Sequence, residues 1–245
     1  MFSRLLTHFS TGLSDIVNLF SPRTCPVCGR MMHEGEYFVC TFCRLKAPLT
    51  NFAADDTNPM AEYLRNVIPV RHAAALMWFV ADSDWQRAVH DMKYRFRPRY
   101  AAMLGEWLGG ELRLSGMYDD VDAVTYVPLH PLKRIGRGYD QAELVAEGVA
   151  SQMHLPVVRG AVVRCVNNPS QTQNGYLERL RNVDGIFAVR HPERLEGRHL
   201  LLVDDVFTTG ATILSCGETI IRSANNVELS IATVALSQTG FAIDR

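Results

Sequence analysis

A continuous apolar run that leads directly into two aspartates constrains this chain more than any other feature. Residues 200–213 have the sequence LLLVDDVFTTGATI, and the four residues from Leu200 to Val203 are all apolar. Such a run is typical of a strand that is covered on both faces, as in a parallel sheet with helices on either side. Ligands of these sheets bind just beyond the carboxyl ends of the strands. We therefore expect Asp204 and Asp205 to lie at a binding site.

The residues that follow the two aspartates suit a phosphate group. Threonines, Gly210 and Ala211 precede a predicted helix over residues 210–224. Small residues let backbone N–H groups surround an anion, and a helix N-terminus adds partial positive charge. We expect a ribose 5-phosphate here, with its hydroxyls on the aspartates, its phosphate on the loop and a divalent metal nearby. The alternative, an aspartate that only caps the helix, accounts for one carboxylate but not for two.

Strand and helix patterns alternate through the C-terminal half of the chain. Predicted strands cover 121–127, 157–166, 186–190, 199–203 and 227–236, and predicted helices cover 140–153 and 210–224. Upstream, the pattern predicts a strand over 72–80 and one or two helices over 84–114. Alternation of this kind favours an α/β domain with a mainly parallel sheet. We place that domain at 119–245, after a linker and helical region at 51–118.

A four-cysteine motif precedes these elements. The spacing is C-x2-C-x11-C-x2-C, formed by Cys25, Cys28, Cys40 and Cys43. Two such pairs offer four thiolates to one tetrahedral Zn²⁺, and a site closed by four thiolates is structural. Pro26 and Gly29 suit the tight turn. Two disulfides or four unrelated thiols are the alternatives, and a reducing compartment disfavours disulfides. We expect a structural zinc module over 22–50.

The N-terminal residues and the overall charge limit the location and the partners. Apolar residues at helical spacing predict an amphipathic helix over 1–21, without the continuous apolar stretch of a secretory signal or a membrane span. The net charge of −1 excludes a protein that is basic throughout, although a local basic face remains possible. We expect a cytoplasmic protein that is not integral to a membrane.

Several segments resemble known families. Residues 200–212 resemble the signature with which type I phosphoribosyltransferases bind 5-phosphoribosyl 1-diphosphate (PRPP). VPLHPLKRIGRGYDQAELVA (127–146) and SQTQNGYLERLRNVDGIF (170–187) resemble segments of ComF-type competence proteins, also called the GntX or amidophosphoribosyltransferase-like family. That family also has an N-terminal cysteine knuckle. This chain departs from its pattern at Asp140, where the family has asparagine.

The resemblance implies a type I phosphoribosyltransferase fold and a set of site residues. It implies PRPP or a nucleoside 5′-phosphate as the ligand. The loop after strand 121–127 suits the diphosphate because guanidinium groups bind phosphate oxygens bidentately. Asp204, Asp205 and Arg179, the last from a closing loop at 167–184, are the expected catalytic residues, and Mg²⁺ with arginines would neutralise the leaving diphosphate. The expected PRPP-binding residues are Asp204, Asp205, Val206, Phe207, Thr208, Thr209, Gly210, Ala211, Thr212, Lys133, Arg134 and Arg137.

Three functions remain open at this stage. The first is PRPP-dependent transfer to an unknown acceptor, held by a hood from residues 61–118 or by the zinc module. The second, implied by the ComF resemblance, is the handling of single-stranded DNA during uptake with competence proteins as partners. The basic segment 91–101 would contact phosphates, although such an edge is usually a solvated face. The third is a PRPP or nucleotide sensor without catalysis.

Overall fold

The computed structural model describes residues 23–94, 98–166 and 185–237, with only the backbone described for 91–94. The chain divides into two compact units, one up to Ala47 and one from Pro48 onward. The predicted amphipathic helix over 1–21 lies outside the described residues.

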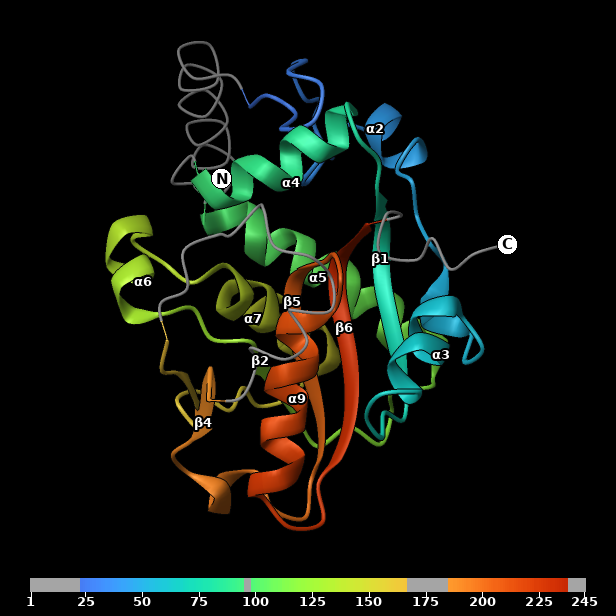
Figure 1. Ribbon diagram of the computed structural model, residues 1–245. Coiled ribbons are helices and arrows are strands. Elements are labelled where there is room, and N and C mark those ends of the chain that lie inside the picture. The colour runs from blue at the N-terminus through green and yellow to red at the C-terminus, as the bar shows by residue number, and fades with distance from the viewer. Residues whose placement is uncertain (1–22, 95–97, 167–184, 238–245) are drawn as a thin grey trace, which may run out of the picture. The chain divides into compact units, whose positions relative to one another are not determined.

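The second unit is built on a four-stranded parallel sheet (Figure 1). Its strand order is β1 (Ala73–Phe79), β6 (Glu228–Ser237), β5 (His199–Phe207) and β2 (Ala123–Tyr126). The two central strands are buried over most of their length, as expected for strands covered on both faces, while Asp204, Asp205 and Val206 of β5 are half-buried. The predicted parallel sheet is therefore confirmed. Its edge strand β1 confirms the strand predicted over 72–80, although that segment lies upstream of the α/β domain predicted at 119–245.

Helices cover both faces of this sheet. The structure contains α3 (Pro59–Arg65), α4 (Asp84–Tyr94), α5 (Pro98–Ser115), α6 (Pro131–Arg137), α7 (Gln141–Met153) and α9 (Ala211–Ser223), with 3₁₀ turns η1 (Phe52–Ala54) and η2 (Pro192–Arg194). The helices α5 and α7 lie behind the sheet in Figure 1, and α9 lies in front of it. The predicted helices over 84–114, 140–153 and 210–224 are confirmed within a few residues.

Two predictions of local structure are wrong. The predicted strand over 157–166 shortens to β3 (Val162–Arg164), which pairs antiparallel with β4 (Phe187–Val189) outside the main sheet. The strand predicted to end at 203 continues to Phe207. The first part of the predicted linker and helical region at 51–118 is held by Asn58, whose buried amide donates to Ala73 O at 2.8 Å while its oxygen caps α3.

Glycines set the distance between α5 and α7. A Cβ on Gly105 would lie 2.1 Å from Val145 O, and one on Gly148 would lie 2.1 Å from Ala102 O. No side chain fits at these separations, so the two helix backbones are in contact. Because α7 begins at the carboxyl end of β2, this contact positions the N-terminus of α7.

Candidate functional site

The four cysteines of the predicted metal site lie together in the first unit. Their sulfur atoms are all within 4.8 Å of one another, and the Cys28 and Cys40 sulfurs are 3.7 Å apart. This matches the edge of about 3.8 Å expected for a tetrahedron with Zn–S bonds of about 2.3 Å. All four are free thiols rather than disulfides. The cluster therefore fits a metal ion such as zinc.

The backbone around the cysteines explains why their sulfur atoms lie close together. Gly29 has a φ of +73°, and its N–H donates to Cys25 O at 2.8 Å, which closes the predicted knuckle turn. The N–H of Cys40 donates to Cys25 Sγ at 3.4 Å. The backbone hydrogen bond from Arg30 lowers the pKa of the Cys28 thiol to about 7, whereas burial raises the pKa of Cys43. A thiol that ionises near neutral pH favours metal binding.

A pocket of about 440 Å³ opens in the second unit, around the carboxyl ends of β2 and β5. Its walls come from the end of β1, from α4, from the segment between β2 and α7, from β3 and from the turn between β5 and α9. The volume falls in the range of roughly 300–1,000 Å³ that is usual for small-molecule sites. Asp204, Asp205, Val206, Thr208 and Thr212 all line it, together with Lys133 and Arg137.

The two aspartates lie within β5 rather than after it. Both are half-buried, and the backbone N–H of Asp205 donates to Asp204 Oδ1 at 2.8 Å. Ladder pairing with β6 continues beyond them to Phe207. The strand therefore carries its carboxylates on a rigid backbone, while the turn that begins at Thr208 remains available to a ligand.

The turn between β5 and α9 forms a small hollow lined by residues 206–213 with Asp204. Gly210 has a φ of +75°, and a Cβ there would meet the Phe207 ring at 2.4 Å. Gly210 occupies the N-cap position of α9 and offers no side chain, and the Thr209 hydroxyl accepts from Ala211 N at 3.5 Å. The first N–H groups of α9 thus face a hollow suited to an anion.

Tyr63 of α3 contacts this turn. The Tyr63 hydroxyl donates to Thr209 O at 3.3 Å, and its ring makes an edge contact with Phe207, with the ring centres 6.1 Å apart. Tyr63 is separated from the turn by more than half of the chain, and its role was missed because no local motif marks it.

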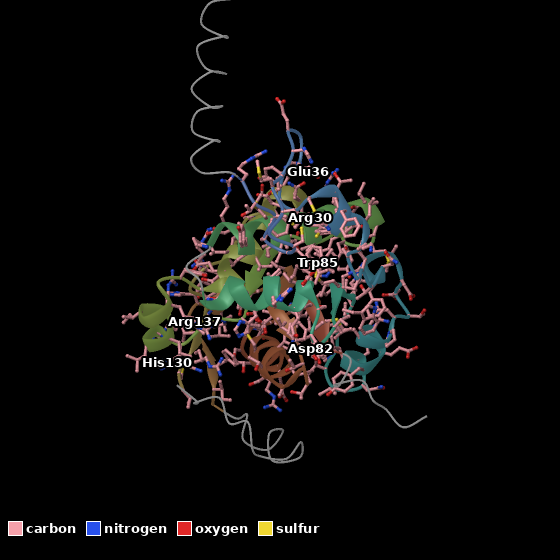
Figure 2. All side chains as sticks on the ribbon, turned by 90° about the horizontal axis from the view of Figure 1, so that it is seen from above. Arg30, Glu36, Asp82, Trp85, His130 and Arg137 are labelled. Atoms are coloured by element: carbon pink, nitrogen blue, oxygen red, sulfur yellow. The ribbon has the colours of Figure 1, made fainter. Side chains whose placement is uncertain are left out.

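The predicted basic loop after β2 is instead the helix α6, which begins at Pro131 with His130 as its N-cap. Seen from above in Figure 2, α6 carries Arg137 to one side of α4. Lys133 and Arg137 line the pocket. Arg134 does not, because its guanidinium pairs with Glu143 at 3.0 Å on the exposed side of α6. The structure thus brings two of the three predicted cations to the site.

Asp140 has a local structural role. Its Oδ1 accepts from Ala142 N at 3.1 Å, which caps α7, and its Oδ2 accepts from Leu129 N at 2.7 Å. The side chain is buried, and burial raises the pKa of this carboxyl. Both oxygens are therefore directed at backbone groups, although the residue also lines the pocket.

Three polar pocket residues were not predicted from the sequence. His90 comes from α4, Gln141 from the start of α7 and Arg164 from β3. Gln141 lies within the segment 127–146, but nothing in its pattern indicated a side chain that faces the pocket. Arg179 and the rest of the predicted closing loop at 167–184 lie outside the described residues.

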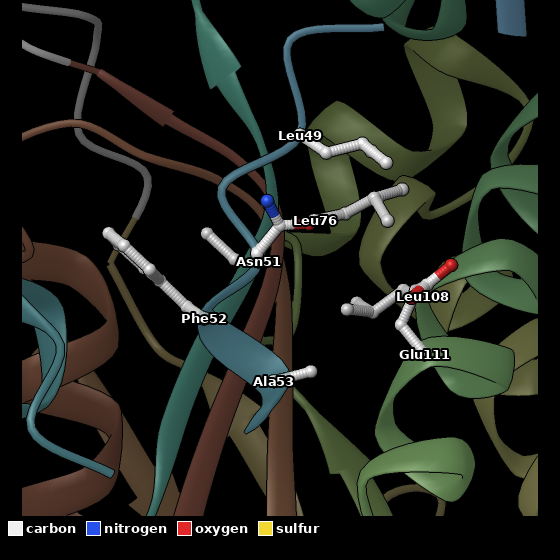
Figure 3. A pocket seen from close by; sticks show the side chains of 8 residues that line it. Leu49, Asn51, Phe52, Ala53, Leu76, Leu108 and Glu111 are labelled. Atoms are coloured by element: carbon white, nitrogen blue, oxygen red, sulfur yellow. The ribbon is translucent and has the colours of Figure 1, made fainter. Parts of the chain in front are cut away.

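A second, much smaller pocket lies on the β1 side of the sheet (Figure 3). It measures about 20 Å³ and is walled by Leu49, Phe52, Leu76 and Leu108, with Glu111 at its side. A space of this size holds about one water molecule. It is a packing defect beside the core rather than a ligand site.

Comparison with known proteins identifies relatives. The DNA utilization protein YhgH of Escherichia coli (strain K12) is 28% identical over 214 residues, which cover 82% of this chain and 92% of that protein. Competence protein ComFC of Bacillus subtilis (strain 168) is 30% identical over 124 residues, 50% of this chain and 48% of that protein. The chain is a relative of the ComF competence proteins. The resemblance predicted from its motifs is confirmed, while no protein-family model matches this ComF relative.

Among solved structures, the glutamine PRPP amidotransferase from B. subtilis, complexed with ADP and GMP, has a TM-score of 0.39 and 19% identity. The match covers 58% of this chain and 30% of that chain. The adenine phosphoribosyltransferase from Leishmania tarentolae has a TM-score of 0.36 and 12% identity, over 75% of this ComF relative and 89% of that chain. Within the described residues, no helix combines the length and hydrophobicity needed to cross a bilayer.

Proposed function

We propose that this ComF relative binds PRPP in the 440 Å³ pocket and transfers its phosphoribosyl group to an acceptor that is not yet identified. One observation carries the proposal. Asp204 and Asp205 share a single pocket with Lys133 and Arg137, beside the hollow at the N-terminus of α9. Carboxylates, cations and an anion hollow are the three groups that a ribose with a phosphate and a diphosphate requires.

Each part of the pocket has a task in this proposal. The two aspartates accept hydrogen bonds from the ribose hydroxyls, and the N–H groups at the start of α9 bind the 5′-phosphate. Lys133 and Arg137 bind the diphosphate and stabilise its charge as it leaves C1 of the ribose. The reaction passes through an oxocarbenium-like state that bulk water would hydrolyse, so an enclosed site favours transfer to the acceptor.

We further propose that magnesium accompanies the ligand and that zinc occupies the cysteine cluster. Within the described parts of the chain, only the cysteines form a group of three or more metal-binding side chains. Magnesium would therefore be held largely by oxygens of the ligand and by water, with Asp204 or Asp205 as a protein ligand. When bound, it supplies positive charge to the diphosphate.

Calorimetric titration with PRPP tests the proposal. Asp205→Asn keeps the shape of the side chain but removes its charge, and we expect the affinity for PRPP to fall by about tenfold or more, the loss of one charge-assisted hydrogen bond. Asp119→Asn is the matched control, because Asp119 is exposed in the turn before β2.

Native protein that binds no PRPP would overturn the proposal. If Asp205→Asn leaves the affinity for PRPP unchanged, the ribose does not bind at the end of β5. Tight binding without release of diphosphate in the presence of candidate acceptors would favour a PRPP sensor over a transferase.

The names of the relatives point to a cellular role in DNA uptake or use, which we propose for this chain as well. One feature of the first unit favours contact with single-stranded DNA. The half-exposed ring of Phe42 has the Arg30 guanidinium 4.6 Å from its centre and the Lys46 ammonium 4.3 Å away. A base can stack on such a ring while the cations bind phosphates. Phe42→Ala should then weaken oligonucleotide binding about tenfold, while Tyr37→Ala, also exposed, should change it less.

A further inference from the structure

The amide of Gln141 is an unusual feature of the pocket wall. Gln141 is the first residue of α7, and only 2% of it is exposed. Its Oε1 accepts a hydrogen bond from Arg137 Nη1 at 2.9 Å. Its Nε2 is buried and has no hydrogen-bond partner among the described residues. Buried donors are normally satisfied, so one that lines a pocket indicates a missing acceptor.

The orientation of this amide follows from its neighbour. A guanidinium can only donate, so the Gln141 atom that faces Arg137 must be the oxygen. The two N–H groups on Nε2 are then held in place by Arg137 and cannot turn to another role. Whatever satisfies them must offer hydrogen-bond acceptors from within the pocket.

The surrounding charges indicate what kind of acceptor this is. Burial lowers the pKa of the Lys133 ammonium, and the nearby guanidinium groups of Arg164, at the end of β3, and of Arg137 lower it further. Burial also lowers the pKa of Arg164, and the opposite influence of Asp204 does not cancel this. Three cations held near one another in a half-buried wall repel each other unless an anion lies between them.

The nearby carboxyl of Asp140 does not fill that position. Its two oxygens accept from Ala142 N and Leu129 N, so its charge is already shared with two backbone donors. The pocket therefore combines three cations and one oriented neutral donor, carried by α6, α7 and β3, and it shares Asp204, Thr208 and Thr212 with the hollow at α9.

We propose that Gln141 and Arg164, together with Lys133 and Arg137, form an oxyanion site that binds a diphosphate-sized group directly through protein donors. This inference builds on the proposed function and names two residues that nothing in the sequence motifs had assigned. It also replaces Arg134, which pairs with Glu143 outside the pocket. Gln141 Nε2 and the Arg164 guanidinium donate to oxygens of the same group, and Arg137 holds the amide in position.

Inorganic diphosphate is the probe, titrated into the full chain by calorimetry without magnesium. Gln141→Leu keeps the volume of the side chain and removes both donors, and we expect diphosphate binding to weaken about tenfold, as for the loss of a hydrogen bond to a charged group. Arg164→Gln should weaken it by a similar factor or more. Arg134→Gln is the matched control and should leave binding within about twofold, as expected of an exposed pair.

A second measurement separates binding from a purely structural role. Gln141→Leu removes the buried Nε2 donor and also the hydrogen bond that Oε1 accepts from Arg137, so Arg137→Met, which breaks the same bond but keeps the buried amide, is the reference. Without ligand, Gln141→Leu should unfold at the same or a higher urea concentration than Arg137→Met. A lower urea midpoint than that of Arg137→Met would show that Nε2 supports the fold, and would overturn its assignment to a ligand.

The inference and the proposed function fail in different ways. Diphosphate binding that falls with Gln141→Leu and Arg164→Gln but not with Arg134→Gln supports the inference even if PRPP does not bind. If PRPP binding falls with Asp205→Asn but not with Gln141→Leu or Arg164→Gln, the proposed function stands and the inference is overturned. A native chain that binds neither compound overturns both.

Discussion

The four-cysteine cluster takes all of its side chains from residues 25–43, whereas the charged pocket draws on segments between Phe79 and Thr212. In the first case the spacing of the motif alone brings the sulfurs within bonding range of one metal. In the second, the sheet, β3 and four helices must first assemble, and Lys133 then lies near Arg164 in a pocket that Asp205 also lines. A site whose residues lie close together in the sequence can thus be predicted in full from its motif. A site whose residues are spread along the chain can be predicted from the sequence only at its most distinctive segment.

The largest effect should come from a substitution in the four-cysteine cluster. Cys28→Ser removes one of four thiolates and should abolish stoichiometric metal in the purified chain, since structural zinc contributes about 10–16 kcal/mol of apparent binding energy at neutral pH. Cys165→Ser is the control, because Cys165 is exposed and far from the motif in sequence. Metal analysis after dialysis measures both, and equal metal in the two variants would contradict the zinc assignment.

A smaller effect should come from the packing that supports the charged pocket. Gly148→Ala places a Cβ 2.1 Å from Ala102 O and should lower the free energy of unfolding by about 1–3 kcal/mol or more. It should also weaken PRPP binding by displacing the start of α7. Gly110→Ala, on the open side of α5, should be neutral or stabilising by up to about 1 kcal/mol.

Urea unfolding of both glycine variants checks this prediction, with metal content as a second readout. Because the cysteine cluster takes none of its residues from α5 or α7, Gly148→Ala should retain its metal. Equal stability of the two variants would show that α5 and α7 can move apart without cost.

The smallest effect concerns His199, the first residue of β5, at the end of the strand opposite the pocket. Burial lowers the pKa of His199 although Asp120 Oδ1 lies 3.3 Å from its Nδ1, so folding favours the neutral ring. Because the unfolded chain then binds the proton more readily, this contribution to stability is present above about pH 6.5 and is lost as the pH falls through the folded pKa.

Urea midpoints compared at about pH 7.5 and about pH 5.5 measure this loss. His199→Asn should show a weaker dependence on pH than the native chain. An unchanged dependence would mean that other groups govern stability in acid. PRPP binding should respond little, because His199 begins β5 at the opposite end of the strand from the pocket.

The sequence predicted those features that depend on near neighbours in the chain. The apolar run before Asp204 predicted a buried parallel strand, and the cysteine spacing predicted the cluster. The strand boundary at 203 was wrong because ladder pairing with β6 carries β5 on to Phe207, and polar residues do not by themselves end a paired strand.

The remaining features depend on contacts between distant segments. Tyr63 reaches the turn at Thr209 only after β1 has joined the sheet, and Arg164 enters the pocket because β3 pairs with β4 rather than with the main sheet. Arg134 and Arg137 are indistinguishable in the sequence and lie one turn apart on α6, yet Arg134 pairs with Glu143 whereas Arg137 bonds to Gln141 and lines the pocket. No pattern within a single segment contains this information.

The strand order has a consequence for how the chain folds during its synthesis on the ribosome. β6 is made last among the described strands, yet it lies between β1 and β5 in the sheet. Until residues 228–237 leave the exit tunnel, β1 has no partner strand in the main sheet, although Met77 can already bridge to Leu49. The sheet can therefore form completely only after β6 has been synthesised, and until then the unpaired edge of β1 is a site at which the nascent chain can aggregate.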